Sequence, residues 1–160
     1  MKRALVIGCP GAGKSTFARR LRDKTGLPLY YLDRLYWRPD RTHLSKEVFD
    51  ARLEDILRRE SWIIDGNYAR TLPVRMARCD AVFFLDYPGA VCLAGIAHRR
   101  GTQREDMPWV ETGEDPALSA FVRGFRKTVR PQIIHCLERA KGVEIHRFRD
   151  RAEAEDYLNL

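Results

Sequence analysis

Eight residues near the N-terminus, Gly8 to Ser15, have the types and the spacing that phosphate chemistry requires. They read Gly-Cys-Pro-Gly-Ala-Gly-Lys-Ser and fit the pattern GxxxxGK[ST], directly after the apolar run Ala4–Ile7 and before a helical pattern. Glycines in such a loop let backbone N–H groups point at phosphate oxygens, and the dipole of the following helix adds to the attraction. The pattern therefore predicts a loop that binds a nucleoside triphosphate, with ATP and Mg²⁺ as the expected ligands.

Two side chains of this loop are expected to have separate roles. Lys14 should reach the β- and γ-phosphates, and the hydroxyl of Ser15 should ligate Mg²⁺. The other residues expected to contact the nucleotide here lie in the loop or directly after it: Gly8, Pro10, Gly11, Ala12, Gly13 and Thr16.

Three carboxylates are candidates for the remaining chemistry, because each stands where a predicted strand ends. They are Asp33, Asp65 and Asp86. The carboxyl ends of parallel strands face the ligand crevice of an open sheet, so we expect the three to lie at the same edge, beside the phosphate loop. Any one of them could instead be an ordinary turn residue. Asp65 is the preferred metal ligand, since Gly66 follows it and allows a ligand to approach the backbone closely.

The elements that must position these residues alternate between short apolar runs and longer helical patterns. This alternation is typical of βαβ units around a parallel sheet and predicts an α/β fold. Most of the runs are apolar on both faces, as a sheet covered by helices requires. Five strands are predicted: Ala4–Ile7, Leu29–Leu32, Trp62–Ile64, Ala81–Leu85 and Val143–Ile145.

Two helices are predicted from apolar residues at helical spacing. The first runs from about Leu44 to Leu57, with Ser45 as its N-cap and Leu44 packed on Phe49. The second carries an apolar stripe from Leu118 to Val129, and Pro131 should bend or end it.

Length and composition indicate the broad class of protein. The chain has 160 residues, enough for one well-packed domain, so a single domain over residues 1–160 is expected. No apolar run approaches the roughly 20 residues of a membrane span, so we expect a soluble cytoplasmic protein with no membrane partner. The four cysteines show no metal-site spacing and are interpreted as buried or incidental thiols.

The net charge of +7 fits either a nucleic acid or an anionic small molecule as partner. The basic residues lie around the phosphate loop or are interleaved with acids, and they form no continuous basic tract with aromatic platforms. Nucleotide binding is therefore favoured, while a nucleic-acid partner stays open as the less favoured alternative.

Several segments resemble the adenylate-kinase-like P-loop kinases, which include shikimate and gluconate kinases. Ile64-Asp65-Gly66 and Phe84-Leu85-Asp86-Tyr87-Pro88 look like the third and fourth strands of adenylate kinases. A closer resemblance is to the bacterial DNA topology modulation protein branch of this superfamily. It rests on the phosphate loop and on the segments Tyr31–Trp37, Trp62–Tyr68 and Arg104–Met107.

The resemblance implies a three-layer P-loop NTPase fold whose five-stranded parallel sheet has the order 2-3-1-4-5. It also implies an acceptor-binding insertion at about residues 33–60, a short mobile lid at about residues 99–114, and a monomer or homodimer. In this family, arginines at the lid entrance contact the phosphates or the base of the nucleotide. By this resemblance Arg99 and Arg100 stand at the lid entrance, Arg104 lies in the lid itself, and Arg123 corresponds to the arginine that follows an acidic pair in adenylate kinases.

The sequence departs from adenylate kinases at two places. Thr112 stands where their first lid arginine would be, and Asn67–Arg70 replaces the residues that would bind the base of a monophosphate. Asp33 resembles the acceptor aspartate of shikimate-type kinases, so it is expected to orient the acceptor and to take its proton if the nucleophile is a hydroxyl.

These observations predict a kinase that moves the γ-phosphoryl group of ATP to a small acceptor. A hydroxyl compound, a nucleoside and a nucleoside monophosphate all remain open as acceptors. The alternative is an ATP-dependent regulator associated with DNA topology, which would hydrolyse ATP without a small acceptor. A third alternative is a module that binds the nucleotide without turnover.

Overall fold

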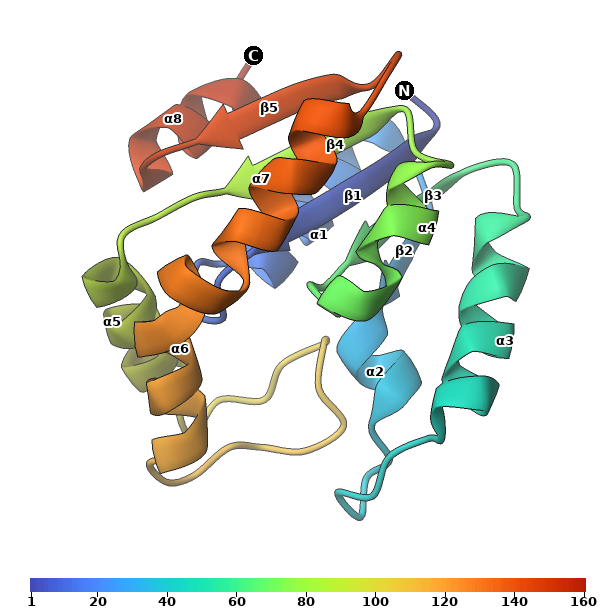
Figure 1. The fold of residues 1–160 in the computed structure, drawn as a ribbon. Helices are drawn as coiled ribbons and strands as arrows, with labels where there is room; N and C mark the ends of the chain where they lie inside the picture. The colour runs from blue at the N-terminus through green and yellow to red at the C-terminus, as the bar shows by residue number, and fades with distance from the viewer.

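A parallel sheet of five strands forms the centre of the molecule in a computed structural model that describes all 160 residues (Figure 1). The strand order is β2-β3-β1-β4-β5, which confirms the predicted order and the predicted α/β class. The strands are β1 (Arg3–Gly8), β2 (Leu29–Tyr31), β3 (Trp62–Asp65), β4 (Ala81–Leu85) and β5 (Glu144–Phe148).

Helices cover both faces of the sheet and make the fold three layers thick. Helices α1 and α8 pack on one face, where Phe17 and Tyr157 meet the rings of β4 and β5, whereas α4 and α7 cross the other face (Figure 1). The helices are α1 (Lys14–Thr25), α2 (Leu32–Tyr36), α3 (Lys46–Leu57), the short 3₁₀ helix η1 (Ala69–Thr71), α4 (Leu72–Met76), α5 (Gly89–Arg99), α6 (Pro116–Thr128), α7 (Arg130–Arg139) and α8 (Arg151–Leu158).

Burial in the core explains why the inner strands could be predicted from apolar runs in the sequence. Residues Ala4–Ile7 of β1 and Trp62–Ile64 of β3 are fully buried, because both strands have helices on both faces. The edge strand β5 differs. It runs to Phe148 rather than ending at Ile145. The exposed Ile145 alternates with His146 and Phe148, whose rings contact the ring of Tyr157 in tilted arrangements.

Both predicted helices are present. Helix α3 begins after Ser45, whose hydroxyl accepts a hydrogen bond from the N–H of Val48 at 3.3 Å, and both Leu44 and Phe49 are buried. The apolar stripe after Leu118 belongs to α6. Helix α7 follows with Pro131 in its first turn, so the proline does mark the change of helix.

One long segment has no helix or strand. Residues 100–115, called the 100–115 loop below, connect α5 to α6 and coincide with most of the expected lid (Figure 1). The N–H of Gly101 donates to the carbonyl of Glu111 at 2.6 Å, which closes the base of the loop. None of the helices is both long and apolar enough to cross a membrane.

Candidate functional site

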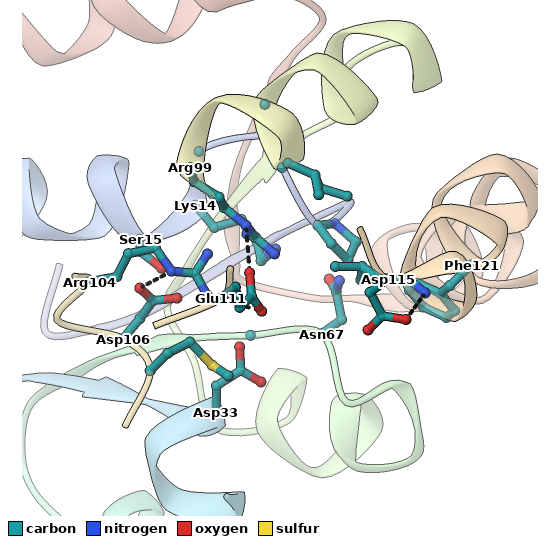
Figure 2. A pocket seen from close by; sticks show the side chains of 18 of the residues that line it. Lys14, Ser15, Asp33, Asn67, Arg99, Arg104, Asp106, Glu111, Asp115 and Phe121 are labelled. Carbon is teal, nitrogen blue, oxygen red and sulfur yellow. Dashed lines mark hydrogen bonds and ion pairs between the residues drawn. The ribbon is translucent and has the colours of Figure 1, made fainter. Parts of the chain in front are cut away.

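A cavity of about 1590 Å³ lies at the carboxyl ends of the inner strands, between the phosphate loop, α2 and the 100–115 loop (Figure 2). Most of the residues expected to bind nucleotide, metal or acceptor line it. These are Pro10, Gly11, Gly13, Lys14, Ser15, Thr16, Asp33, Asp65, Arg99, Arg100 and Arg104. Gly8, Ala12 and Arg123 are not among the lining residues.

The glycines of the phosphate loop allow it to lie directly on α5. A Cβ atom on Gly11 would stand 2.0 Å from the carbonyl oxygen of Cys92, and one on Gly95 would stand 2.0 Å from the carbonyl oxygen of Gly11. Gly11 and Gly13 also have φ angles of 87° and 95°, which favour glycine. The loop geometry therefore depends on Gly95, which the sequence analysis did not single out.

Two long-range contacts hold the phosphate loop in place. Asn67 receives a hydrogen bond from the N–H of Gly8 at 3.0 Å and donates to the carbonyl of Gly8 at 2.5 Å. Arg151, at the start of α8, donates to the carbonyl oxygens of Ala12 and Gly11 at 3.1 and 3.4 Å. Gly8 and Ala12 thus shape the loop from behind rather than from the cavity side.

Cys9 is not among the residues that line the cavity. It is buried, and the hydrogen bond with the Cys92 thiol and the burial raise the pKa of the Cys9 thiol. All four cysteines are free, and three of them are buried. The side chain of Cys9 is therefore part of the packing between the phosphate loop and α5.

Ser15 and Asp65 form the oxygen pair that a magnesium site requires. The hydroxyl of Ser15 donates to Oδ2 of Asp65 at 2.8 Å, while Oδ1 of Asp65 is buried without a hydrogen-bond partner. Burial raises the pKa of Asp65 to about 6, although the nearby Lys14 opposes this. A buried carboxylate oxygen without a partner beside a hydroxyl fits Mg²⁺, which prefers oxygen ligands.

Asp33 occupies the first turn of α2 and faces the same cavity. The hydroxyl of Tyr68 donates to its Oδ1 at 2.7 Å. Burial raises the pKa of Asp33, against the opposing effect of this hydrogen bond. The carboxylate therefore stays oriented while one of its oxygens remains available for a ligand.

The third strand-end carboxylate does not join the other two. Asp86 accepts hydrogen bonds from Arg130 at 2.9 and 3.0 Å and from Arg147 at 2.8 Å. Burial alone would raise the pKa of Asp86, but these bonds outweigh it and hold the pKa below its ordinary value. Asp86 does follow β4 at the same edge of the sheet, but it does not line the cavity, because Arg147 of β5 and Arg130 of α7 bind its carboxylate.

The expected lid arginines form an ion-pair network across the cavity (Figure 2). Glu111 lies 3.5 Å from Nε of Arg99 and 3.6 Å from Nη2 of Arg104, and Asp106 lies 3.6 Å from Nε of Arg104. Arg99 and Arg104 are thereby held facing the phosphate loop. Arg100 lines the cavity as well.

Arg123 lies elsewhere. Helix α6 turns Leu118 and Phe121 toward the cavity, and a residue two positions beyond Phe121 lies on nearly the opposite side of the helix. Arg123 is exposed there and has no ion pair. The structure therefore does not bring it to the site where the sequence comparison placed it.

The 100–115 loop is fixed to the opposite wall of the cavity. Glu105 pairs with Arg22 at 3.1 Å and accepts a hydrogen bond from the hydroxyl of Tyr31. Arg34 donates to the carbonyl oxygens of Glu105 and Met107 at 2.5 and 3.3 Å. Further along the loop, the ring of Trp109 meets that of Trp37, with centroids 5.6 Å apart.

Comparison with known proteins shows a similarity of fold only. No family model and no curated protein matches the chain. Among solved structures, it is similar to shikimate kinase from Bacteroides thetaiotaomicron, with a TM-score of 0.64, 18% identity and coverage of 99% of this chain and 94% of that one.

Two further solved structures give the same likeness. Shikimate kinase from Acinetobacter baumannii in complex with shikimate has a TM-score of 0.65, 16% identity and coverage of 99% and 89%. A sugar kinase from Janibacter sp. HTCC2649 has a TM-score of 0.57, 16% identity and coverage of 99% and 91%. The fold is that of the α/β P-loop kinases, and identities this low show the fold alone.

Proposed function

We propose that this protein is a kinase that transfers the γ-phosphoryl group of ATP to a hydroxyl group of a small acceptor. One observation carries the proposal: the phosphate loop and the half-buried carboxylate of Asp33 face one cavity, which the 100–115 loop covers. Donor and acceptor would meet there with little water between them, as phosphoryl transfer requires.

The donor side relies on positive charge. Lys14 would contact the β- and γ-phosphates together with the N–H groups of the phosphate loop. Arg99 and Arg104 already face this region through Glu111, so phosphate oxygens could take the place of that carboxylate. Such fixed donors stabilise the charge that spreads over the transferring group.

Ser15 and Asp65 would hold Mg²⁺, as their geometry and the unpartnered Oδ1 of Asp65 support. When bound, the ion neutralises charge on the β- and γ-phosphates. Asp65 would be ionised for this role near neutral pH, since its pKa lies at about 6. Asn67 keeps Gly8 in the conformation that lets the loop face the phosphates.

A hydroxyl acceptor fits the acceptor half of the cavity better than a monophosphate, which would need free arginines. Four arginines near this region are engaged with protein groups, and of these only Arg70 lines the cavity. Arg34 binds backbone carbonyls of the 100–115 loop, and Arg38 binds Thr42 and His43. Arg70 pairs with Asp50 through two hydrogen bonds, and the fully buried Arg75 donates to the carbonyls of Gly66 and its neighbours. Arg41 and Lys46 also line the cavity, where both are exposed and Arg41 lies over the ring of Trp109.

Asp33 would orient the acceptor hydroxyl and take its proton. The raised pKa strengthens a carboxylate as a base, and Tyr68 keeps it in place. The alternative is the regulatory ATPase associated with DNA topology that the sequence resemblance suggests. It requires no acceptor, whereas here the half-buried carboxylate of Asp33 lines the same cavity as the phosphate loop.

A screen of ATP consumption with product detection tests the proposal. The panel contains nucleosides, nucleoside monophosphates, sugars and small hydroxy acids. We expect consumption that depends on a hydroxyl acceptor and yields its phosphate ester. Hydrolysis at the same rate with every compound and with none would favour the regulatory ATPase, and transfer only to a monophosphate would contradict the hydroxyl acceptor.

A further inference from the structure

Asp106, in the 100–115 loop, is a buried carboxylate whose bonding is incomplete. It is 5% exposed and lines the cavity, yet neither of its carboxylate oxygens accepts a hydrogen bond, and Oδ1 is fully buried. Arg104 lies 3.6 Å from this oxygen, which is an ion pair but too long for a hydrogen bond. A buried carboxylate oxygen without a donor is costly, so the site has an unfilled requirement for one.

The position of Asp106 is set by its neighbours rather than by its own contacts. Glu105 is held by Arg22 and Tyr31, and Arg34 binds the carbonyl oxygens of Glu105 and Met107 on both sides of Asp106. The backbone around Asp106 is therefore anchored to α1, β2 and α2. These contacts fix the position of the Asp106 carboxylate at the cavity wall.

Asp106 and Asp33 lie in the same part of the cavity. Both line it, and Figure 2 shows them below the phosphate loop with the Asp33 carboxylate directed inward. They come from different segments, Asp33 from α2 and Asp106 from the loop that covers the cavity. Aromatic side chains of Tyr36, Trp37 and Trp109 line the region as well.

We propose that Asp106 binds a second donor group of the acceptor, adjacent to the hydroxyl that Asp33 holds. This inference rests on the proposed kinase function and names its substrate class: a neutral or cationic compound with neighbouring donors, either a vicinal diol or an amino alcohol. Two carboxylates accept such donors and repel a phosphate monoester. The aromatic walls suit the apolar face of a ring or an ammonium group.

The proposal is tested with matched acceptors that differ by one donor. The probe pairs are adenosine with 2′-deoxyadenosine, myo-inositol with a monodeoxyinositol, and 2-aminocyclohexanol with cyclohexanol, and adenosine 5′-monophosphate serves as the anionic probe. For the pair that is phosphorylated, kcat/KM of the wild-type protein should favour the complete member by about 10- to 100-fold, because a site built for a donor rejects the analogue that lacks it.

Asp106→Ala should reduce this preference to within about 3-fold, mainly by loss of turnover on the complete member, and Asp106→Asn should give an intermediate preference. Glu105→Gln is the control, because Glu105 supports the same loop but does not line the cavity. It should lower kcat/KM for both members by the same factor and leave their ratio unchanged.

Two results would overturn the inference while leaving the proposed function intact. They are an unchanged preference in Asp106→Ala and an equal loss of preference in Glu105→Gln. Absence of turnover with every acceptor, or transfer only to the phosphate of adenosine 5′-monophosphate, would instead contradict the proposed function itself, and with it the inference.

Discussion

At the scale of single residues, the site is defined by the few polar atoms that the fold buries without satisfying them. Asp65, Arg99 and Asp106 all line the cavity, and Oδ1 of each aspartate and Nε of the arginine are buried without a hydrogen-bond partner. Other charged groups nearby are satisfied, as Asp86 and Arg75 show. Buried polar atoms are nearly always bonded in folded proteins, so these exceptions mark where ligands are expected.

Lys14→Ala is the first prediction at this scale. Removing the ammonium group should lower kcat/KM for ATP-dependent turnover by about 10²–10³-fold, the usual effect of losing one electrostatic contact to the transition state. The measurement is steady-state kinetics, with ATP affinity determined separately by calorimetry. Lys24→Ala, on the exposed end of α1, is the control and should change neither quantity. Unchanged turnover in Lys14→Ala would refute the assignment of the phosphate loop.

At the scale of elements, the phosphate loop depends on its contact with α5. Gly95→Ala would place a Cβ atom 2.0 Å from the carbonyl oxygen of Gly11, so the loop or the helix has to move. We expect ATP affinity to fall at least 10-fold, which corresponds to about 1.4 kcal/mol. Isothermal titration calorimetry with ATP and magnesium measures this change.

A second glycine in a helix provides the matched control. Gly124, in α6, has nothing within 4 Å of its Cβ position, so Gly124→Ala should leave ATP affinity unchanged. It should also raise the free energy of unfolding by up to about 1 kcal/mol through the higher helix propensity of alanine. Equal ATP affinity in both alanine variants would show that the close contact with α5 does not position the loop.

The ion-pair cluster around Asp86 joins β4, β5 and α7. Because the folded pKa of Asp86 is lowered, the folded protein binds fewer protons there than the unfolded chain, so this group adds stability above its unfolded pKa. That contribution is lost as the pH falls through the folded pKa. Asp86→Asn should therefore lower the free energy of unfolding by about 2–3 kcal/mol at pH 7, the value of hydrogen bonds to charged groups.

Urea unfolding at a series of pH values measures this difference. The gap between wild type and Asp86→Asn should narrow as the pH falls below about 4, where the unfolded carboxyl group protonates. Asp55→Asn, at an exposed position on α3, is the control and should show only a small change at any pH. A gap that stays constant down to low pH would contradict the charge-based account of the cluster.

These elements also show what could be predicted from the sequence. The inner strands and the first turn of α3 could be predicted, because a continuous apolar run and a cap residue such as Ser45 are both local features of the sequence. The end of β5 was misplaced, because an edge strand needs no continuous apolar run. The sequence could not show that Asp86 is withheld from the cavity, because its partners, Arg130 and Arg147, lie far along the chain.

At the scale of the whole molecule, the cavity is assembled from segments that no local pattern connects. Arg151 reaches the phosphate loop from the C-terminal helix, and Asn67 reaches Gly8 from beyond β3. Neither contact leaves a signal in the sequence beyond the position of each residue after a strand. Lys14, Ser15, Asp33 and Asp65 could be predicted because the phosphate-loop pattern and the strand ends fix where they lie.

The central claim is that the ATP site and the acceptor site face one cavity, with Asp33 at the reacting hydroxyl. The most direct test is to measure the turnover of Asp33→Asn with the acceptor that the screen identifies. We predict that kcat falls by about 10²–10⁴-fold, the usual contribution of general-base catalysis, while ATP affinity stays close to that of the wild type. Asp55→Asn, on the exposed face of α3, should retain full activity. Full turnover of Asp33→Asn with its acceptor would contradict the account.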